Sequence, residues 1–408
     1  MIPSFLAPGY IGTLAGTGEP GFSGDGGPAV SARLSEPKQL VFDQYGNLYI
    51  ADSENHCIRM VDRRTGIIST VAGLPCQTHA ENEPPIDQPS QAHLEEDPLD
   101  KGLDVPTNQF RHTADLSGTV RYSIGQGHSA IRFAGDGGPA VNALLNFPSA
   151  LAVEEGVAVY IADMLNHRIR RVDLATGIIT TLAGTGQAKW KGDGGPAREA
   201  ALNEPVALAL DRARRQLYVA DQSNNRVRVI DLTTGIITTI AGTGEAAYTG
   251  DGPALEVALA GPSGLALDAV GHLYIADTFN GRIRKLDTDT GMLETALGDG
   301  HAFRFDGAAS EQSMSVARPY GIAFDRQGQL LITDSDNHLL RKWDPRGSMI
   351  SIVAGDGQAR FAGDNGPADK SSLNYPFGVA VDPWGHIAIA DTFNHRIRLI
   401  VAPSPHQR

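Results

Sequence analysis

The chain has 408 residues, of which 41% are apolar, and its formal net charge is −13. Nucleic acid is not an expected partner, because binding to a phosphate backbone requires a positive footprint and no Lys/Arg-rich stretch supplies one. No run of 18 apolar residues is present, so no membrane-spanning helix is expected. Residues 1–10 show no secretory signal, which predicts a cytoplasmic location, or a secreted or periplasmic one if a leader has been removed.

The most regular feature of the chain is a phrase that occurs six times, Ala-Asp-x-x-Asn-His-x-Ile-Arg with variants. Its aspartates are Asp52, Asp163, Asp221, Asp277, Asp334 and Asp391. The last five are spaced by 58, 56, 57 and 57 residues, a fixed period typical of a stacked array of one supersecondary unit. The first interval is 111 residues, which is about 54 residues more than one repeat.

The repeat at 202–242 shows how each unit is built. Four short segments rich in β-type residues follow one another between Gly, Asp or Asn turns: 206–211, 216–221, 226–231 and 235–242. This order predicts a four-stranded antiparallel meander. The first segments are almost wholly apolar, whereas the third alternates Arg with Val. The first strands are therefore expected to line the core and the last to lie at the rim.

Such a sheet cannot bury both of its faces alone, so it must pack against copies of itself. The chain ends after a third strand at 396–400, whereas residues 10–18 match the fourth strand at 178–186. We therefore expect the N-terminal strand to complete the last sheet and close the ring, which leaves no long sheet edge exposed. The predicted fold is all-β: a six-bladed β-propeller of four-stranded antiparallel blades, one domain over residues 1–408.

A family resemblance follows from the repeated phrase. The run Asp336-Asn337-His338-Leu339, with the related runs at 55–56, 166–167 and 394–395, resembles the NHL repeat. The connecting phrase Gly-Asp-Gly-Gly-Pro-Ala, at 24–29, 135–140 and 192–197, is similar to that of bacterial and teneurin-type members. The resemblance covers nearly the whole chain outside residues 74–131. It implies the propeller fold and little about function, because propellers host many unrelated activities.

The Asp, Asn, His and Arg residues that recur in every blade favour a structural role. A repeated Asp accepts backbone N–H groups in its turn, and the Arg six or seven residues later pairs with a carboxylate. The Gly-Asp-Gly-Gly loops lack the Lys-Ser/Thr of a phosphate loop, and Asp-Gly turns need no cation. No metal ligand is therefore assigned, and the cofactor, if any, is unknown.

Function is expected where the repeats differ. In propellers, the loops that lead into the innermost strands surround one mouth of the central channel, and a proline marks each of these loops here. The neighbours of these prolines vary, and those predicted to bind a ligand are Lys38, Gln39, Phe147, Ser149, Ser263, Tyr375 and Phe377. They combine charge, hydroxyl groups and aromatic rings, as a small-molecule site requires. The alternative, scattered rim residues at a solvated opening, stays open.

Residues 74–131 form an insertion between the first two blades, on the side of the channel mouth. The segment is acidic and Pro-rich, and it contains His79, His93, His112 and His128. A loop of this length predicts a lid over the channel, with a disordered excursion as the alternative. Its histidines lack the spacing of a zinc site. Cys57 and Cys76 lie near adjacent predicted strands; two free buried thiols are favoured over a disulfide.

Two classes of function follow. The first is an enzyme that acts on a small, anionic molecule at the mouth, by metal-independent acid–base chemistry of undetermined lyase, cyclase or hydrolase type. Its candidate catalytic residues are Arg318, which would hold the anion, and Tyr320 and His112, which would move a proton. Amidating lyases that share the NHL repeat carry zinc-binding His directly after the inner-strand proline, and no His stands there in this chain. The second class is a non-catalytic scaffold that binds a protein or peptide on the same face.

Overall fold

The computed structural model describes residues 6–75, 133–300, 315–347 and 350–403, together with two short strands in the insertion. Contacts divide the chain into two units, one made of Met1–Cys76 with Ile131–Arg408 and the other of Gln77–Ala130. In the second unit, β6 (Thr113–Ala114) pairs antiparallel with β7 (Val120–Arg121). None of the helices in the described ranges is long and apolar enough to cross a membrane.

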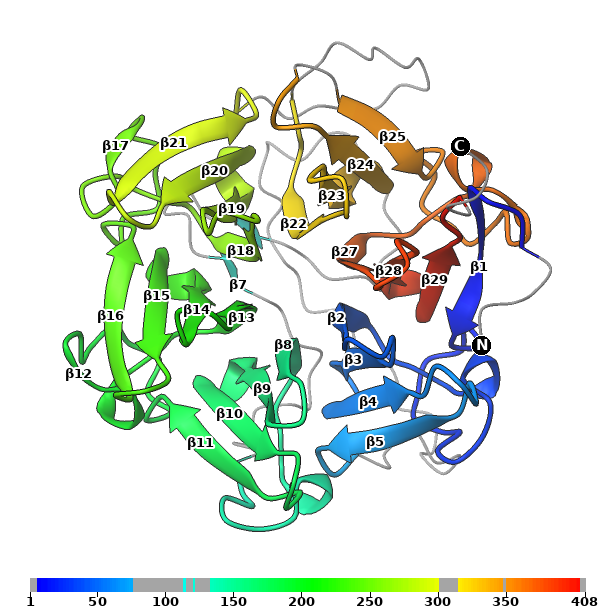
Figure 1. The fold of residues 1–408 in the computed structure, drawn as a ribbon, viewed down its shortest axis with the longest axis horizontal. Coiled ribbons are helices and arrows are strands. Elements are labelled where there is room, and N and C mark those ends of the chain that lie inside the picture. Colours follow the sequence, from blue (N-terminus) through cyan, green and yellow to red (C-terminus); the bar gives the residue numbers. More distant parts are fainter. Residues whose placement is uncertain are drawn as a thin grey trace, which may run out of the picture. The chain divides into compact units, whose positions relative to one another are not determined.

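The first unit is a six-bladed β-propeller, with six sheets arranged around one axis (Figure 1). Blade 1 contains β2 (Pro37–Phe42), β3 (Leu48–Asp52), β4 (Cys57–Val61) and β5 (Ile68–Ala72). Blade 2 contains β8 (Pro148–Glu154), β9 (Ala158–Asp163), β10 (Arg168–Asp173) and β11 (Ile179–Ala183). Blade 3 contains β13 (Pro205–Asp211), β14 (Gln216–Asp221), β15 (Arg226–Asp231) and β16 (Ile236–Ala241).

The other three blades repeat this order. Blade 4 contains β18 (Pro262–Leu267), β19 (Leu273–Asp277), β20 (Arg282–Asp287) and β21 (Met292–Leu297). Blade 5 contains β22 (Pro319–Phe324), β23 (Leu330–Asp334), β24 (Leu339–Trp343) and β25 (Ile350–Ala354). Blade 6 contains β27 (Pro376–Val381), β28 (Ile387–Asp391), β29 (Arg396–Ile400) and β1 (Tyr10–Ala15). Two-residue strands extend three blades at the rim: β12 (Gly195–Pro196), β17 (Gly252–Pro253) and β26 (Gly366–Pro367).

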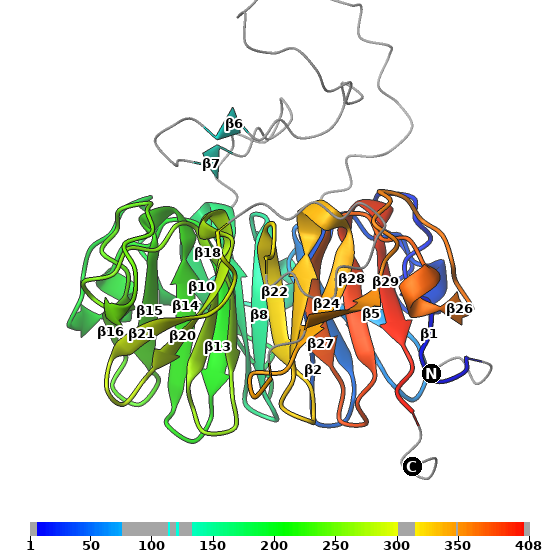
Figure 2. The same ribbon diagram turned by 90° about the horizontal axis from the view of Figure 1, so that it is seen from above.

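Short 3₁₀ helices lie in the loops. Five follow a second strand: Met164–Asn166, Gln222–Asn224, Thr278–Asn280, Ser335–Asn337 and Thr392–Asn394. Four lie in the connections between blades: Ala29–Ser31, Ala140–Asn142, Ala197–Glu199 and Ala368–Lys370. Figure 2 shows that the strands of all blades run between the two faces of the ring, so these loops and connections lie at the faces and rim.

The N-terminal strand closes the ring, as predicted. β1 pairs antiparallel with β29, with Ile11 opposite Ile400 and Thr13 opposite Arg398. β1 is therefore the outermost main strand of blade 6 (Figure 1). The first and last main strands of the described chain, β1 and β29, are therefore neighbours in one sheet. Opening the ring at blade 6 would require breaking all the hydrogen bonds between them.

The inner strands approach one another closely around half of the ring. Gly264, Gly321 and Gly378 occupy equivalent positions on β18, β22 and β27. A Cβ atom on Gly264 would collide with the Tyr320 carbonyl oxygen of the next blade, and the other two glycines meet the same obstacle. The backbone contact between these blades therefore requires glycine. In blades 1 to 3 the equivalent residues are Gln39, Ala150 and Ala207.

Each blade contains one copy of a buried Asp–Asn–Arg set, shown here for blade 3. Asp221 Oδ1 accepts the backbone N–H of Asn203 at 2.7 Å, and its Oδ2 accepts Asn224 Nδ2 at 2.8 Å. Arg228 donates to the same Oδ2 at 3.3 Å and to Asp193 Oδ1 at 2.5 Å. Burial raises the pKa of Asp221 to about 6, and these donors oppose the rise.

The equivalent aspartates of the other blades also accept one backbone N–H and one Arg each. The structural role predicted for the repeated Asp and Arg residues is therefore confirmed.

Candidate functional site

One face of the propeller, here called the axial face, carries three variable residues in each blade. The pre-proline position precedes the inner-strand proline and holds Glu36, Phe147, Glu204, Gly261, Arg318 and Tyr375. The post-proline position follows it and holds Lys38, Ser149, Val206, Ser263, Tyr320 and Phe377. The loop position comes two residues after the repeated Asp and holds Glu54, Leu165, Ser223, Phe279, Asp336 and Phe393.

The repeated histidines fix the backbone of the pre-proline position. Glu36, Phe147, Glu204 and Tyr375 have φ values of 47°, 53°, 53° and 47°, in the left-handed region that non-glycine residues rarely occupy. Each donates its N–H to Nδ1 of the His in the preceding blade, at 3.0 to 3.2 Å. This interblade bond offsets the local strain and presents the variable side chains in the same way.

In blades 3 to 6, the pre-proline residue and the loop residue of the same blade contact each other. Ser223 Oγ donates to Glu204 Oε2 at 2.5 Å, and Arg318 Nε lies 3.4 Å from Asp336 Oδ2. The rings of Tyr375 and Phe393 lie 5.2 Å apart. In blade 4, Phe279 covers the place that a side chain on Gly261 would take. In these four blades the two positions therefore carry matching side chains, although 17 to 18 residues lie between them in sequence.

Lys38 lies at the centre of a group that we call the axial cluster: Lys38, Glu36, Phe147, Phe377 and Phe393. The Lys38 ammonium is 4.2 Å from the ring centre of Phe377, 5.5 Å from that of Phe147 and 5.6 Å from that of Phe393. These rings come from the two blades on either side of blade 1. Ring faces attract a cation, so the ammonium is held where three blades meet. Its ion pair with Glu36 Oε2 is 3.4 Å long.

Two tyrosines continue the cluster into blades 5 and 6. The Tyr320 ring packs edge-on against Phe377 with 4.5 Å between ring centres, and the Tyr375 ring packs against His338 at 4.6 Å. Burial raises the pKa of both tyrosines, so both hydroxyl groups keep their protons at neutral pH. Tyr320 is therefore suited to donate a hydrogen bond and not to accept a proton.

Five of the residues predicted as site residues thus come together: Lys38, Phe147, Tyr320, Tyr375 and Phe377. Arg318 lies beside them, because its charge acts on both tyrosines and its guanidinium is 5.8 Å from the Phe279 ring. His112 and almost all of the insertion at 74–131 lie outside the described residues. Cys57 is buried. Cys76, like His112, lies outside the described residues. Where the structure is described, no three His, Cys, Asp or Glu side chains gather as metal ligands.

Gln39, Ser149 and Ser263 are placed differently, because their polar groups join neighbouring blades. Gln39 Oε1 accepts the N–H of Leu151 at 3.3 Å, and Ser149 Oγ donates to the Pro205 carbonyl at 3.0 Å. Ser263 Oγ accepts Gln222 Nε2 at 2.7 Å and donates to its own loop. We therefore leave these three residues out of the proposed site.

Ser149 stands in for a hydroxyl that blade 2 lacks. In four blades, the residue after the repeated Asp donates to the inner-strand proline carbonyl of the next blade; these residues are Ser53, Thr278, Ser335 and Thr392. Blade 2 has Met164 there, and Ser149 supplies the bond to blade 3 instead. All six junctions therefore carry a side-chain hydrogen bond at the axial face.

The loop position was missed in the sequence analysis. Phe393 contacts Lys38, and Asp336 pairs with Arg318. Both lie inside the repeated phrase, whose constant residues were interpreted as structural. The loop position could have been found because it differs among the blades, although it lies between an Asp and an Asn that recur in every blade.

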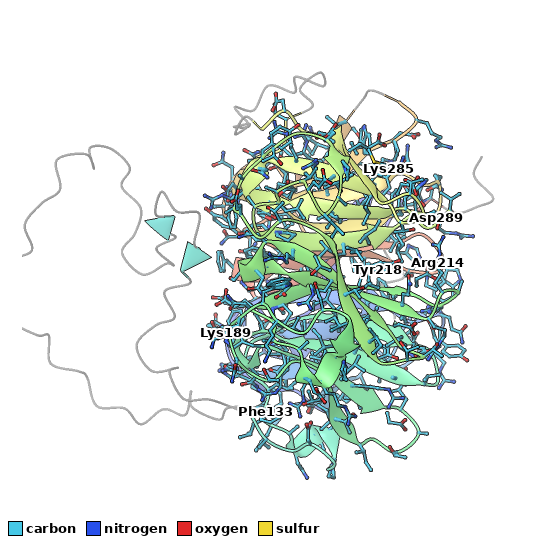
Figure 3. All side chains as sticks on the ribbon, turned by 90° about the vertical axis from the view of Figure 1, so that its left-hand side faces the viewer. Phe133, Lys189, Arg214, Tyr218, Lys285 and Asp289 are labelled. Carbon is cyan, nitrogen blue, oxygen red and sulfur yellow. The ribbon has the colours of Figure 1, made fainter. Side chains whose placement is uncertain are left out.

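A second hollow lies away from the axis, between blades 3 and 4. It has a volume of about 570 Å³, and Arg214, Tyr218 and Asp289 line it (Figure 3). Arg214 pairs with Asp289 at 3.0 Å, and the Tyr218 hydroxyl donates to Gln216 at 2.8 Å. The comparable hollow between blades 6 and 1 is only about 30 Å³. Because Arg214 pairs with Asp289 and Tyr218 with Gln216, we assign the larger hollow no chemistry.

Comparisons with known protein families agree with this architecture. The teneurin NHL domain matches residues 11–108, and the NHL repeat matches residues 317–343. The chain is an NHL-repeat β-propeller. NHL repeat-containing protein 2 of Gallus gallus is 27% identical over 315 residues, which is 70% of this chain and 42% of the relative. Protein SUPPRESSOR OF QUENCHING 1, chloroplastic, of Arabidopsis thaliana is 29% identical over 270 residues, which is 64% of this chain and 25% of the relative.

This NHL propeller therefore spans less than half the length of these relatives. Among solved structures, an auxiliary nutrient binding protein from Bacteroides ovatus matches with a TM-score of 0.59 at 13% identity, covering 97% of this chain and 76% of that one. A gluconolactonase from Xanthomonas campestris matches with a TM-score of 0.51 at 12% identity, covering 91% and 87%. At such identities both likenesses concern the fold alone.

Proposed function

We propose that this NHL propeller binds a small anionic molecule with a flat apolar part at the axial cluster. The observation that carries the proposal is the Lys38 ammonium, which is held by three aromatic rings and has one long ion pair. At 3.4 Å, that pair is looser than the 2.7–2.9 Å of a strong charge-assisted hydrogen bond. An ammonium carries three donors, so Lys38 retains capacity for a ligand anion while the rings contact its apolar part.

Arg318 supplies a second cation on the same face. Its Nε lies 3.4 Å from Asp336, and about a third of its side chain is exposed. An anion that reaches over Tyr320 and Phe377 from Lys38 toward Arg318 would meet positive charge at both ends. We further propose that the bound molecule reacts there by acid–base chemistry, as an enzyme substrate. The alternative, a scaffold that binds a protein or peptide on this face, predicts no such dependence on small anions.

Binding is tested with benzoate as the anionic probe and benzamide as its neutral counterpart, by ligand-observed NMR and calorimetry. Replacing Lys38 with Met keeps the length of the side chain and removes its charge. We expect Lys38→Met to weaken benzoate binding about tenfold, which corresponds to about 1.4 kcal/mol, and to leave benzamide binding nearly unchanged. Lys189→Met, at an exposed lysine on another loop, is the matched control and should bind as the wild type does.

Catalysis is tested by incubating the protein with a metabolite extract and following each compound by mass spectrometry. Consumption of an acid by the wild type, lost in both Lys38→Met and Arg318→Met, would support the enzyme. Absence of benzoate binding, or binding that Lys38→Met leaves unchanged, would overturn the proposed anion site and favour the scaffold.

A further inference from the structure

Two of the six pre-proline residues are glutamates, and the structure gives them the same backbone. Glu36 and Glu204 have φ values of 47° and 53°, and each donates its N–H to a histidine Nδ1 of the preceding blade at 3.2 Å. Their surroundings differ at the post-proline position, two residues later. Blade 1 has Lys38 there, which pairs with Glu36, whereas blade 3 has Val206.

Among the described residues, Glu204 has no cation as a partner. No ion pair joins it to another residue in the described part of the chain, and its hydrogen-bond partner is Ser223, at 2.5 Å from Oε2. His167, which accepts the Glu204 N–H, adds no positive charge at neutral pH, because burial and Arg168 lower its pKa. Arg168 itself stacks on Phe133 and donates to backbone carbonyls of its own blade.

This environment favours the protonated carboxyl group. Glu204 is half-buried, so its charged form loses hydration without gaining a cation in exchange. Burial raises the pKa of Glu204, and the hydrogen bond from Ser223 only partly opposes that rise. Glu36, beside Lys38, and Glu204, beside Val206, therefore have different environments. Such a difference suits one carboxyl group to remain ionised and the other to donate a proton.

We propose that Glu204 is the proton-donating carboxyl group of the axial face. In its protonated form, Glu204 transfers the proton to a basic oxygen of the anion bound at the axial cluster, which leaves Glu204 as the carboxylate; the product leaves with that proton, and solvent reprotonates Glu204. The inference rests on the proposed function, since the acceptor is the molecule proposed to bind there. Ser223 orients the carboxyl group, and Val206 keeps it free of a cation.

The first test needs no ligand. The carboxyl carbons of 13C-labelled glutamates are followed by NMR as the pH is varied, and Glu204→Gln identifies the signal of interest. We expect Glu204 to titrate at a higher pH than an unstructured glutamate, because burial raises its pKa. Val206→Lys gives blade 3 the lysine of blade 1 and should lower this midpoint by about one unit. Val141→Lys adds the same charge at an exposed valine and should leave it unchanged.

The second test asks whether Glu204 faces the bound molecule. Benzoate affinity is measured at pH values on both sides of the Glu204 midpoint. We expect affinity to fall at least threefold as pH rises, because the ionised Glu204 repels the probe, and to stay flat in Glu204→Gln. The flat profile also separates Glu204 from His167, which accepts the Glu204 N–H, and from His338 and His395 on the same face, because Glu204→Gln retains all three. Thermal unfolding checks that each variant folds.

The outcomes distinguish this inference from the proposed function. If Glu204 titrates as an exposed glutamate, or if Val206→Lys does not move its midpoint, the inference is overturned whatever benzoate does. If Glu204 titrates high and benzoate binding depends on Lys38 but not on pH, the anion site stands and Glu204 is not its proton donor. If benzoate does not bind, the proposed function fails and with it the transfer step, while the NMR titration still reports the proton that Glu204 holds.

Discussion

The loop between the second and third strands of each blade contains a constant residue and a variable one, two positions apart. In blade 3 these are Asp221 and Ser223, and in blade 6 they are Asp391 and Phe393. The constant Asp is fully buried and joined to an Arg, whereas the variable residue turns to the axial face and contacts the pre-proline residue. One loop thus serves both the wall of the ring and the candidate site.

The difference between wall and axial face follows from burial. Removing one partner of a buried ion pair leaves a charge without solvation, which typically costs about 3–5 kcal/mol, so every blade must keep the pair. The axial cations are less buried than the wall arginines, because Lys38 and Arg318 keep 16% and 33% of their side chains exposed. The axial positions can therefore differ among blades while the wall stays the same, and the predictions below test this division.

The largest effect is expected for Arg228→Met in the wall. Arg228 is fully buried and contacts both Asp221 and Asp193. Its loss leaves Asp221 buried without a cation, and we expect the free energy of unfolding to fall by about 3–5 kcal/mol. Urea unfolding measures the change. Arg346→Met, at an exposed pair, is the control and should cost less than about 1 kcal/mol.

The pH dependence of Arg228→Met sharpens this prediction. Burial already raises the pKa of Asp221 to about 6 in the presence of Arg228, and the variant removes a cation that opposes the rise. A carboxyl group with a raised folded-state pKa contributes stability that is present below its unfolded pKa and lost as pH rises through the folded one. The variant should therefore lose more stability at pH 8 than at pH 5, relative to the wild type. An equal loss at both pH values would contradict a buried, unpaired Asp221.

The next effect concerns the closure of the ring. Thr392 Oγ1 donates to the Pro37 carbonyl across the junction of blades 6 and 1, and Thr278 makes the same bond between blades 4 and 5. Thr392→Val and Thr278→Val each leave a buried carbonyl without this donor, at a cost of about 1–3 kcal/mol. Denaturation of both variants compares the junctions. Similar losses would mean that the closing junction is as firm as an internal one, and a much smaller loss for Thr392→Val would show a ring that opens there.

Much of the fold was predictable because the same sequence pattern occurs six times, once in each blade. The period, the proline before each inner strand and the missing fourth strand at 396–400 predict six blades and their closure by residues 10–18, and the structure confirms both. The structural role of the constant Asp and Arg residues was predictable for the same reason: whatever all blades need is repeated.

The candidate site was less predictable, because neighbours of the prolines vary for two different reasons. Lys38 and Phe377 contact each other in the axial cluster, for which we propose a ligand. Blade 2 has Met164 where four other blades have a Ser or Thr hydroxyl. The Ser149 hydroxyl makes the bond to the next blade instead. Sequence variation alone does not distinguish a ligand contact from such a compensation. Glu204 was not predicted as a site residue. It differs from Glu36 because blade 3 has Val206 at the position where blade 1 has Lys38.

Ser149→Ala tests this reassignment. Loss of the hydroxyl removes the donor to the Pro205 carbonyl, and we expect about 1 kcal/mol less stability with unchanged benzoate affinity. Adding Met164→Ser to the same chain restores a hydroxyl at the position used by the other blades and should recover part of the loss. Weaker benzoate binding without loss of stability would instead return Ser149 to the ligand site.

The smallest effect is expected for Phe147→Leu, on the axial face. The Phe147 ring lies 5.5 Å from the Lys38 ammonium and is one of three rings that hold it. Leucine keeps an apolar side chain there and removes the ring face, whose contact with the ammonium contributes about 0.5–1 kcal/mol. Benzoate affinity should therefore fall about two- to fivefold, while the urea midpoint stays close to that of the wild type. Leu165→Ala, at the loop position of the same blade, removes apolar bulk but no ring and should leave benzoate affinity unchanged. If both variants weaken benzoate equally, the cluster binds through apolar area alone, and the ring faces around Lys38 have no separate role.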